Sequence, residues 1–500
     1  MTLFSDLALG FSTALSLNNL FYCFVGTLVG TLIGVLPGLG PVATIAILLP
    51  MTFGLDPVTA LIMLAGIFYG AQYGSSTTAI LINLPGEASS VVTALDGHRM
   101  AKEGRAGTAL ATAALGSFFA GTVATLIIAT LAPLLASVAL KFGPAEYFSL
   151  MVLGLIASIA MASGSVVKAL AMIVLGVLLG LVGQDIYTGA PRLNFGQVQL
   201  LDGFDFVAIA MGLFGLAEIC KNLEDEEARS GLINKVNSLW LTMKEFRQIV
   251  FPVLRGTAVG SALGILPGGG ATIGAFAAYL LEKRTSRTPE RFGNGAIEGV
   301  AAPESANNAG AQTSFIPLLT LGIPANATMA MMVGALILHG VTPGPNIITS
   351  EAPLFWGLIA SMWIGNAMLL VLNLPLIGIW VKMLSVPYRL LFPMIVALCC
   401  IGVYTINNST FDVLVLVGFG VIGYILIKLD CEPTPLLLGL VLGPMLEENL
   451  RRAMLTGRGD PMVFLTRPIS ATLLAVAALC LLLMILPAIR KTREVAFKEE

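Results

Sequence analysis

The chain has 500 residues, of which 56% are hydrophobic and only 11% are charged, and its net charge is −2. A soluble domain carries about 25% charged residues, and the mean hydropathy here is +0.90. So few charges cannot cover a water-soluble protein of this length, which excludes an ordinary cytosolic enzyme and predicts an integral membrane protein in a lipid bilayer. The near-neutral charge gives no reason to expect nucleic acid as a partner.

Apolar stretches follow one another along the chain. A bilayer core of about 30 Å needs roughly 20 apolar residues in a helix. Runs without Asp, Glu, Lys or Arg cover residues 106–140, 169–184, 390–411, 413–427 and 468–489. Spans interrupted by Gly, Pro and Asn cover residues 20–52, 57–86, 256–281 and 305–340. Continuous apolar runs predict an all-α membrane protein with about twelve to fourteen crossings, some of them broken or re-entrant helices.

The N-terminal stretch and the cysteines give two further expectations. The first 20 residues carry no Lys or Arg, so Met1 onward is expected to be mature protein rather than a cleaved signal. The cysteines lie in or beside apolar stretches without metal-ligand spacing and are expected to be buried small residues, not a disulfide framework. They are Cys23, Cys220, Cys399, Cys400, Cys431 and Cys480.

A repeat without gaps divides the chain into two halves. Residues 26–40 read GTLVGTLIGVLPGLG and residues 256–270 read GTAVGSALGILPGGG, so nine of fifteen positions are identical. Downstream of each copy, a stretch begins with GAQ and ends with NLPG (residues 70–86) or GIPA (residues 310–325). We interpret the chain as a first membrane repeat (1–235), a cytoplasmic linker end (236–255) and a second membrane repeat (256–500).

The positions of Lys and Arg predict that the repeats are inverted. Residues 50–57 contain no Lys or Arg, whereas their counterpart, residues 282–291, contains four. Further along the bias reverses, because residues 98–105 contain three and residues 339–353 contain none. Loops rich in Lys and Arg stay in the cytoplasm, so equivalent loops are expected on opposite sides of the membrane.

One segment conflicts with this topology. Residues 447–467 contain Arg451, Arg452, Arg458 and Arg467, yet the order of crossings places them outside. An interfacial helix and an error in the number of crossings nearby are alternative explanations.

The repeated motifs contain residues that break helices. Pro removes an amide donor and Gly permits positive φ, so each helix is expected to stop inside the membrane and restart. A restarted helix offers free amides to a carboxylate, and the carbonyls that end the preceding helix suit Na⁺. The alternative is a tight turn or a glycine packing face. The candidate substrate-binding residues here are Pro37, Gly38, Gly40, Pro267, Gly268, Gly269 and Gly270.

A second pair of stretches is rich in hydroxyl and amide side chains. Residues 69–78 read YGAQYGSSTT and residues 304–314 read ESANNAGAQTS. Inside a bilayer such side chains must pair internally or line a wet cavity. The alternative is that Ser and Thr bond to their own helices and hold neighbouring helices together. The candidate substrate-binding residues here are Gln72, Ser75, Ser76, Thr77, Asn83, Asn307, Asn308, Gln312 and Thr313.

Few acids lie near these clusters. Glu304, beside the Asn pair and expected at the edge of the membrane, is the candidate for coupling to a proton or Na⁺, and a solvated loop end is the alternative. The histidines His98 and His339 are expected to be ordinary surface residues. The other acids near the clusters are Glu87, Asp96 and Glu298.

Sequence signatures of enzymes are missing. The chain contains no GxxxxGK[ST], HExxH or GxSxG pattern and no Cys/His metal pattern. We therefore expect no enzyme activity, no ATP-driven transport by this chain alone, and no cofactor or metal site beyond a coupling Na⁺ or H⁺.

Taken together, the motifs resemble the large membrane subunit of the tripartite tricarboxylate transporter family (TctA-like). The resemblance covers about residues 20–468 and rests on LPGLGP, YGAQYGSSTTAILINLPGEASS, ILPGGGA and ESANNAGAQTSFIPLLTLGIP. It implies a multi-pass secondary transporter of a bacterial inner membrane, driven by an ion gradient. It also implies two partners, a periplasmic solute-binding protein and a small four-helix membrane subunit, and carboxylate substrates such as citrate or related organic acids.

Two other classes of function compete with this prediction. One is a stand-alone ion-coupled secondary transporter, or a channel, for organic anions. The other is an intramembrane enzyme, which would need a nucleophile–base pair or metal site that the sequence does not show. The prediction is therefore the binding-protein-dependent carboxylate importer.

Overall fold

The computed structural model describes residues 3–36, 39–161, 165–185, 187–224, 236, 239–266, 270–384 and 388–485. Most of these residues are helical, and one short antiparallel pair of strands joins β1 (Gly183–Gln184) to β2 (Pro191–Arg192). The predicted all-α membrane fold is confirmed.

Six helical segments of the described chain are long and apolar enough to cross a membrane. Seven shorter apolar helices of 10–17 residues accompany them, while the number of crossings stays a prediction. The six segments are Leu17–Gly34, Pro57–Ile82, Ala88–Ala139, Phe206–Glu224, Ala352–Asn373 and Thr410–Lys428.

The first half begins with a hairpin of helices and continues into long, buried ones. Gly104, with φ of 80°, lies in the π-helical turn Ala101–Arg105, which joins the helix that ends at Met100 to the helix that begins at Ala106. The helices are α1 (Leu3–Ala14), α2 (Leu17–Gly34), α3 (Pro41–Leu48) with a 3₁₀ turn (Leu49–Thr52), α4 (Pro57–Ile82), α5 (Ala88–Met100), α6 (Ala106–Ala139), α7 (Pro144–Met161), α8 (Val166–Gly180), a 3₁₀ turn (Val198–Leu200), α9 (Phe206–Ala210), a π-helical turn (Met211–Leu216) and α10 (Ala217–Glu224).

The second half repeats this order at its start. Residues 236–255, interpreted above as the end of a linker, overlap a helix that begins at Met243. The helices are α11 (Met243–Gly264), α12 (Gly270–Thr285), a 3₁₀ turn (Pro289–Arg291), α13 (Glu298–Thr313), α14 (Phe315–Leu321), α15 (Ala327–Leu338), α16 (Ile347–Ser350), α17 (Ala352–Asn373), α18 (Ile377–Met383), α19 (Tyr388–Asn407), α20 (Thr410–Lys428), α21 (Thr434–Thr456), α22 (Val463–Thr466) and α23 (Pro468–Ile485).

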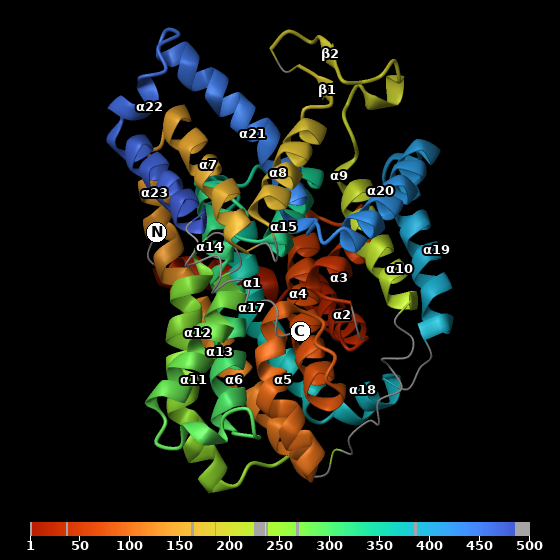
Figure 1. Cartoon of the computed structure of the whole chain (residues 1–500), viewed down its shortest axis with the longest axis vertical. Coiled ribbons are helices and arrows are strands. Elements are labelled where there is room, and N and C mark those ends of the chain that lie inside the picture. Colours follow the sequence, from red (N-terminus) through yellow and green to blue (C-terminus); the bar gives the residue numbers. More distant parts are fainter. Residues whose placement is uncertain are drawn as a thin grey trace.

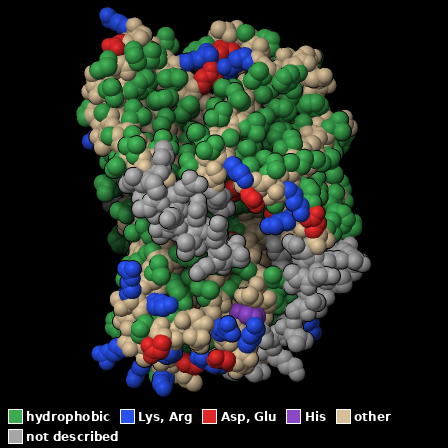
Figure 2. All heavy atoms as spheres, in the orientation of Figure 1, with side chains coloured by type: hydrophobic (Ala, Val, Ile, Leu, Met, Phe, Trp, Pro, Cys, Tyr) green, Lys and Arg blue, Asp and Glu red, His purple; other side chains and the backbone are tan. Residues whose placement is uncertain are grey.

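The helices gather into an upper and a lower part along the long axis of the molecule (Figure 1). The lower part contains α5, α6, α11, α12 and α13, and the upper end carries β1, β2, α21 and α22. Hydrophobic side chains cover much of the face between the two ends, and Lys, Arg, Asp and Glu collect at the ends and in a smaller group at one side (Figure 2). This distribution is that of a protein surrounded by lipid.

The glycines of the repeated motif pack two helix pairs in the same way. A Cβ atom on Gly26, Gly30 or Gly34 of α2 would overlap the backbone of α4, so the two helices touch along their main chains. In the second half, a Cβ on Gly256, Gly260 or Gly264 of α11 would overlap the backbone of α13. Small residues at every fourth position permit such close packing between membrane helices. The motif therefore fixes where α4 and α13 lie.

Loops of the two halves meet in pairs. Arg105 Nη1 donates to Gly295 O at 3.3 Å, and Asp96 Oδ1 accepts from the amides of Gly293, Gly295 and Ala296 at 2.8–2.9 Å. At the end of the 3₁₀ turn Leu49–Thr52 of the first half, Thr52 Oγ1 lies 3.2 Å from His339 Nε2. The first loop of each half thus lies beside the second loop of the other.

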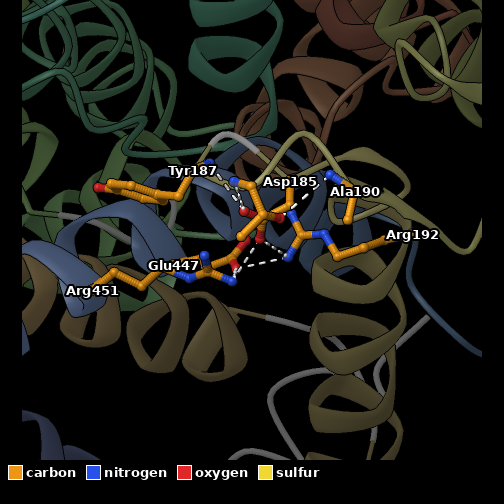
Figure 3. Close-up of polar contacts among 7 residues, drawn as sticks. Asp185, Tyr187, Ala190, Arg192, Glu447 and Arg451 are labelled. Carbon is orange, nitrogen blue, oxygen red and sulfur yellow. Dashed lines mark hydrogen bonds and ion pairs between the residues drawn. The ribbon is translucent and has the colours of Figure 1, made fainter.

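The arginine-rich segment 447–467 lies at the upper end of the molecule, away from the loops around Arg105 and Gly295 (Figure 1). Arg451 pairs with Asp185 at 2.7 Å and with Glu447 at 2.6 Å, and Arg192 also pairs with Glu447 (Figure 3). The Thr188 amide and the Arg451 guanidinium hold the pKa of Asp185 well below its usual range. Ion pairs hold the central arginine of the segment, while the side of the membrane on which the segment lies stays a prediction.

The prediction that the cysteines are buried is correct for only two of them. All six are free, with Cys23 and Cys399 buried and the other four partly buried. None lies in a disulfide bond.

Candidate functional site

A polar centre lies where the buried helix α4 of the first half meets α13 of the second. Every residue from Thr59 to Leu81 of α4 is buried, and so is every residue from Gly299 to Thr313 of α13. The two stretches that the sequence singles out for their hydroxyls and amides lie within these helices. Their polar side chains therefore face protein and not lipid.

Glu304 is at the middle of this centre and is only 1% exposed. Its Oε1 accepts from Ser76 Oγ at 2.7 Å, and its Oε2 accepts from Thr93 Oγ1 at 2.9 Å. Ser117 Oγ and Asn308 Nδ2 each lie 3.3 Å from Oε1. The alternative that Glu304 is a solvated loop end is wrong, because four helices enclose its carboxyl group, whereas its depth in the membrane stays a prediction.

A second acid–amide group joins the halves beside the first. Gln72 Nε2 donates to Asn307 Oδ1 at 3.4 Å, and Asn307 Nδ2 donates to Glu87 Oε1 at 2.9 Å. Ser89 Oγ also donates to Glu87, at 2.6 Å. The remaining oxygen of Gln72 is buried and has no hydrogen-bond partner. Such an unpaired buried oxygen is costly unless a ligand or water binds it.

Glycine and asparagine mark the breaks next to this group. Asn83, with φ of 58°, ends α4, and Gly322, with φ of 72°, ends α14. The left-handed conformation stops a helix, and both breaks lead into a new helix, α5 or α15. A Cβ on Gly40, at the start of α3, would lie 2.5 Å from Gly86 O, so the two breaks of the first half touch. Gly270 begins α12, again with no room for a side chain.

The remaining candidate substrate-binding residues differ in the groups to which they hydrogen-bond. Ser75 Oγ donates to Ser90 Oγ at 3.1 Å and accepts from the amide of Gly86 at 2.9 Å, so it supports the break after α4. Gln312 Oε1 lies 3.5 Å from Thr125 Oγ1. Thr77 and Thr313 bond to their own helices, as the alternative interpretation expects, at 3.1 and 3.0 Å. Outside the described residues lie Pro37, Gly38, Pro267, Gly268 and Gly269.

Positive charge is absent from the contacts of this centre. In the hydrogen bonds and ion pairs of the described chain, no Lys or Arg reaches Glu304 or Glu87. Arg255, one of three basic residues of α11, is instead held by Glu282 at 2.7 Å. The centre offers neutral donors to an anion, and its own carboxylates could hold a cation.

Sequence reasoning missed several members of the centre. Thr93 shares α5 with Ser89 and Ser90, and Ser117 is one of several hydroxyl residues of α6, so the sequence does not single out either of them. Asn366 and Asn373 carry a signal, because two amides seven residues apart lie on one face of the apolar helix α17. Asn366 Oδ1 accepts from Tyr73 OH at 3.2 Å, and Asn373 Oδ1 is buried without a partner.

The histidines were expected at the surface, and both are only partly exposed. His339 contacts Thr52, and His98 Nδ1 lies 3.1 Å from Ile80 O. His98 therefore joins α5 to α4, and His339 joins the end of α15 to the 3₁₀ turn Leu49–Thr52. Among the described residues no group of three or more His, Cys, Asp or Glu side chains is placed to hold a metal ion.

Multiple apolar helices around a buried, largely uncharged polar centre define a membrane transporter. Comparison with known proteins gives the family, since the model of the tripartite tricarboxylate transporter TctA family matches residues 20–438. The chain belongs to this family, which is a family of transporters and not of enzymes.

Two relatives come from Agrobacterium vitis. The chain is 64% identical over 500 residues, the whole length of both proteins, to an uncharacterized 52.8 kDa protein in the TAR-I ttuC' 3' region. It is 62% identical over 241 residues to an uncharacterized protein in the TAR-II ttuC' 3' region, which covers 48% of this chain and all of that relative. No solved structure matches the chain.

Proposed function

We propose that this chain is the large membrane subunit of a binding-protein-dependent secondary transporter in a bacterial inner membrane. The observation that carries the proposal is the family match over residues 20–438, which coincides with the repeated, helix-broken part of the chain. A periplasmic solute-binding protein delivers the substrate, and a small four-helix membrane subunit completes the complex. The substrates are tricarboxylates such as citrate, or related organic acids.

The chemistry of the polar centre supports dependence on a binding protein. Helix-end amides each stabilise an anion by about 0.3–1 kcal/mol when exposed and up to about 2 when sheltered. Micromolar capture requires roughly 8 kcal/mol, and no Lys or Arg contacts Glu304 or Glu87 of the centre within the described residues. A site of this kind is better suited to passing a delivered substrate across the membrane than to capturing the substrate from dilute medium. A stand-alone ion-coupled transporter of organic anions is the alternative, and it would need that affinity within this chain.

We place the substrate where the broken helices meet the amides of the two halves. Gln72 and Asn307 lie at this junction, and the oxygen of Gln72 has no partner. The starts of α5 and α15 supply amides next to the left-handed breaks. Glu304 is the proposed coupling residue for a Na⁺ or H⁺ gradient, because its carboxyl group is buried between the halves.

The pairing of loops supports an inverted arrangement of the two repeats. The loop of Thr52 lies beside that of His339, and the loop of Arg105 lies beside that of Gly295. Repeats of opposite orientation place non-equivalent loops side by side in this way. An inverted pair lets the polar centre face either side by movement of one part against the other.

Uptake of radiolabelled carboxylate by cells tests the proposal. In a strain lacking this chain, the wild-type gene should restore uptake, and Asn307→Ala or Gln72→Ala should reduce it at least about tenfold. The matched control is Thr130→Ala, an exposed hydroxyl in α6 that bonds only to its own helix. The proposed substrate site would be contradicted if Asn307→Ala and Gln72→Ala restored carboxylate uptake as completely as the control does.

A further inference from the structure

A small cavity lies against Glu304, on the side of α17. Its polar lining consists of Tyr73, Ser76, Thr77, Glu304 and Asn373, and the rest is apolar: Ile80, Leu110, Ala113 and Ala114. It has a volume of about 10 Å³ for the centre of a water-sized sphere. That is room for about one water molecule or one small ion.

One side chain of this cavity has an oxygen that is left without a partner. Asn373 is 4% exposed, and its Nδ2 donates to Leu369 O at 3.0 Å. Its Oδ1 is buried and accepts no hydrogen bond. Leaving such an acceptor unpaired costs about 1–3 kcal/mol, so a native structure retains it where something else binds the oxygen.

The other polar groups of the cavity also present lone pairs. The hydroxyl of Ser76 donates to Glu304, that of Thr77 to Tyr73 O, and that of Tyr73 to Asn366 Oδ1. Their hydrogens are therefore engaged elsewhere, and only oxygen lone pairs remain. A cation needs nothing but lone pairs, whereas an anion needs donors, and the polar lining leaves only one donor hydrogen, the second of Asn373 Nδ2.

Charge and size select the cation. With Glu304 ionised, the carboxylate and the neutral oxygens of the lining carry a single negative charge, which a monovalent ion cancels, whereas a divalent ion would leave an unpaired buried charge. Hard oxygen ligands suit the alkali ions better than soft metals. The small volume favours the smaller ions of this group over K⁺.

We infer that Glu304, Asn373, Ser76 and Thr77 form a Na⁺ site, and that Na⁺ is the ion that couples transport. The inference deepens the proposed function, because it names the ion that the proposed Glu304 coupling uses. Asn373 of the second half and Ser76 and Thr77 of the first would then hold the same ion, so that Na⁺ joins the two repeats.

Binding of ²²Na⁺ to the purified full-length chain in lipid nanodiscs tests the site. The wild-type protein should bind ²²Na⁺ saturably, with unlabelled Na⁺ competing at least about tenfold better than K⁺. Glu304→Gln keeps the shape and removes the charge, so binding should be lost. Asn373→Leu should raise the apparent Kd at least about tenfold, and Asn373→Asp should retain binding. Thr77→Val keeps the shape of the side chain and removes its hydroxyl, so it should raise the Kd for Na⁺ several-fold. This variant tests the site if the Glu304 variant does not fold.

The matched control is Ser261→Ala. Its hydroxyl in α11 is also buried and without a partner, but it does not line the cavity. Binding should be unchanged in this variant. No saturable binding by the wild type, or equal binding by Asn373→Leu, Thr77→Val and the control, would overturn the inference and leave a structural water only.

Transport by the complete complex separates this inference from the proposed function. Carboxylate accumulation that is driven by a proton gradient in Na⁺-free buffer would overturn the Na⁺ site and leave the transporter proposal standing. Saturable ²²Na⁺ binding that depends on Asn373, with no carboxylate uptake by the complex under any gradient, would support the site and contradict the proposed function.

Discussion

Ser76 Oγ donates a 2.7 Å hydrogen bond to Glu304 Oε1, so a hydroxyl of the first repeat holds a buried carboxyl group of the second. The two residues are 228 positions apart in the chain. Thr93 holds the other oxygen from the same half. The centre is therefore complete only when the repeats are assembled, and any movement that separates α4 from α13 breaks it.

Ser76→Ala should destabilise the folded protein. Hydrogen bonds to charged groups contribute about 1.5–3 kcal/mol, and the remaining donors to Glu304 Oε1 are 3.3 Å away. Unfolding by SDS titration in mixed micelles measures the difference.

The serines of α6 show why the structure is needed to choose controls. The sequence alone places the serines of residues 106–140 outside the two polar stretches, and it therefore predicts that Ser→Ala there affects transport less than Gln72→Ala or Asn308→Ala. Ser117 accepts from Asn308 at 2.7 Å and belongs to the centre, so Ser117→Ala should behave like Ser76→Ala. Ser137 is exposed and bonds to Leu134 O, so Ser137→Ala should change stability by less than about 0.5 kcal/mol.

Two classes of glycine should respond differently to a larger side chain. A Cβ on Gly260 would overlap the backbone of Ala306, so Gly260→Leu should prevent α11 from packing on α13 and reduce the folded yield. Gly418 has open space around it, so Gly418→Ala should be neutral. Gly38→Leu and Gly268→Leu, in the proposed helix breaks, should insert normally and lose transport. Size-exclusion profiles and uptake by the same cells measure both effects, and normal uptake by the Gly38 and Gly268 variants would leave only a packing role for the motifs.

Reporter fusions test the inverted arrangement. Fusions after Arg105 and after Arg287 should both report cytoplasm, and a fusion after Gly344 should report periplasm. The reason is that the loop of Arg105 contacts Gly295, while His339 contacts the opposite loop at Thr52. If the fusions after Arg105 and after Gly344 reported the same side of the membrane, the repeats could not be inverted.

His339 should make stability depend on pH. Burial lowers the pKa of its imidazole below the usual value, which is about 6.5 in an unfolded chain. The folded state resists protonation that the unfolded state accepts, so stability is complete above about pH 6.5 and falls as the pH drops towards the folded pKa. Melting temperatures of wild type and His339→Gln, compared from pH 8 to pH 5, should converge or cross as the pH falls. A constant difference across this range would show that His339 does not titrate between the two states.

Much of the fold can be predicted from the sequence, because membrane helices must be apolar and continuous. The gapless repeat also locates the two helix pairs that glycines pack. Glu304 is harder to predict, because α13 has the mixed composition of a surface helix, EGVAAPESANNAGAQT, and yet is buried among other helices of the protein. The spacing of Asn373 from Asn366 places both amides on one face of α17, but the sequence does not say whether that face lines a cavity. Which side chains meet depends on the packing of the two halves, which no single segment specifies.

Reconstitution in liposomes tests the central claim most directly. The purified chain is assembled with and without its small membrane subunit and solute-binding protein, and uptake of micromolar labelled citrate is followed under an imposed Na⁺ or H⁺ gradient. We predict gradient-dependent accumulation by the three components together and little by this chain alone. Full-rate accumulation by the chain alone would contradict the tripartite account and favour a stand-alone transporter.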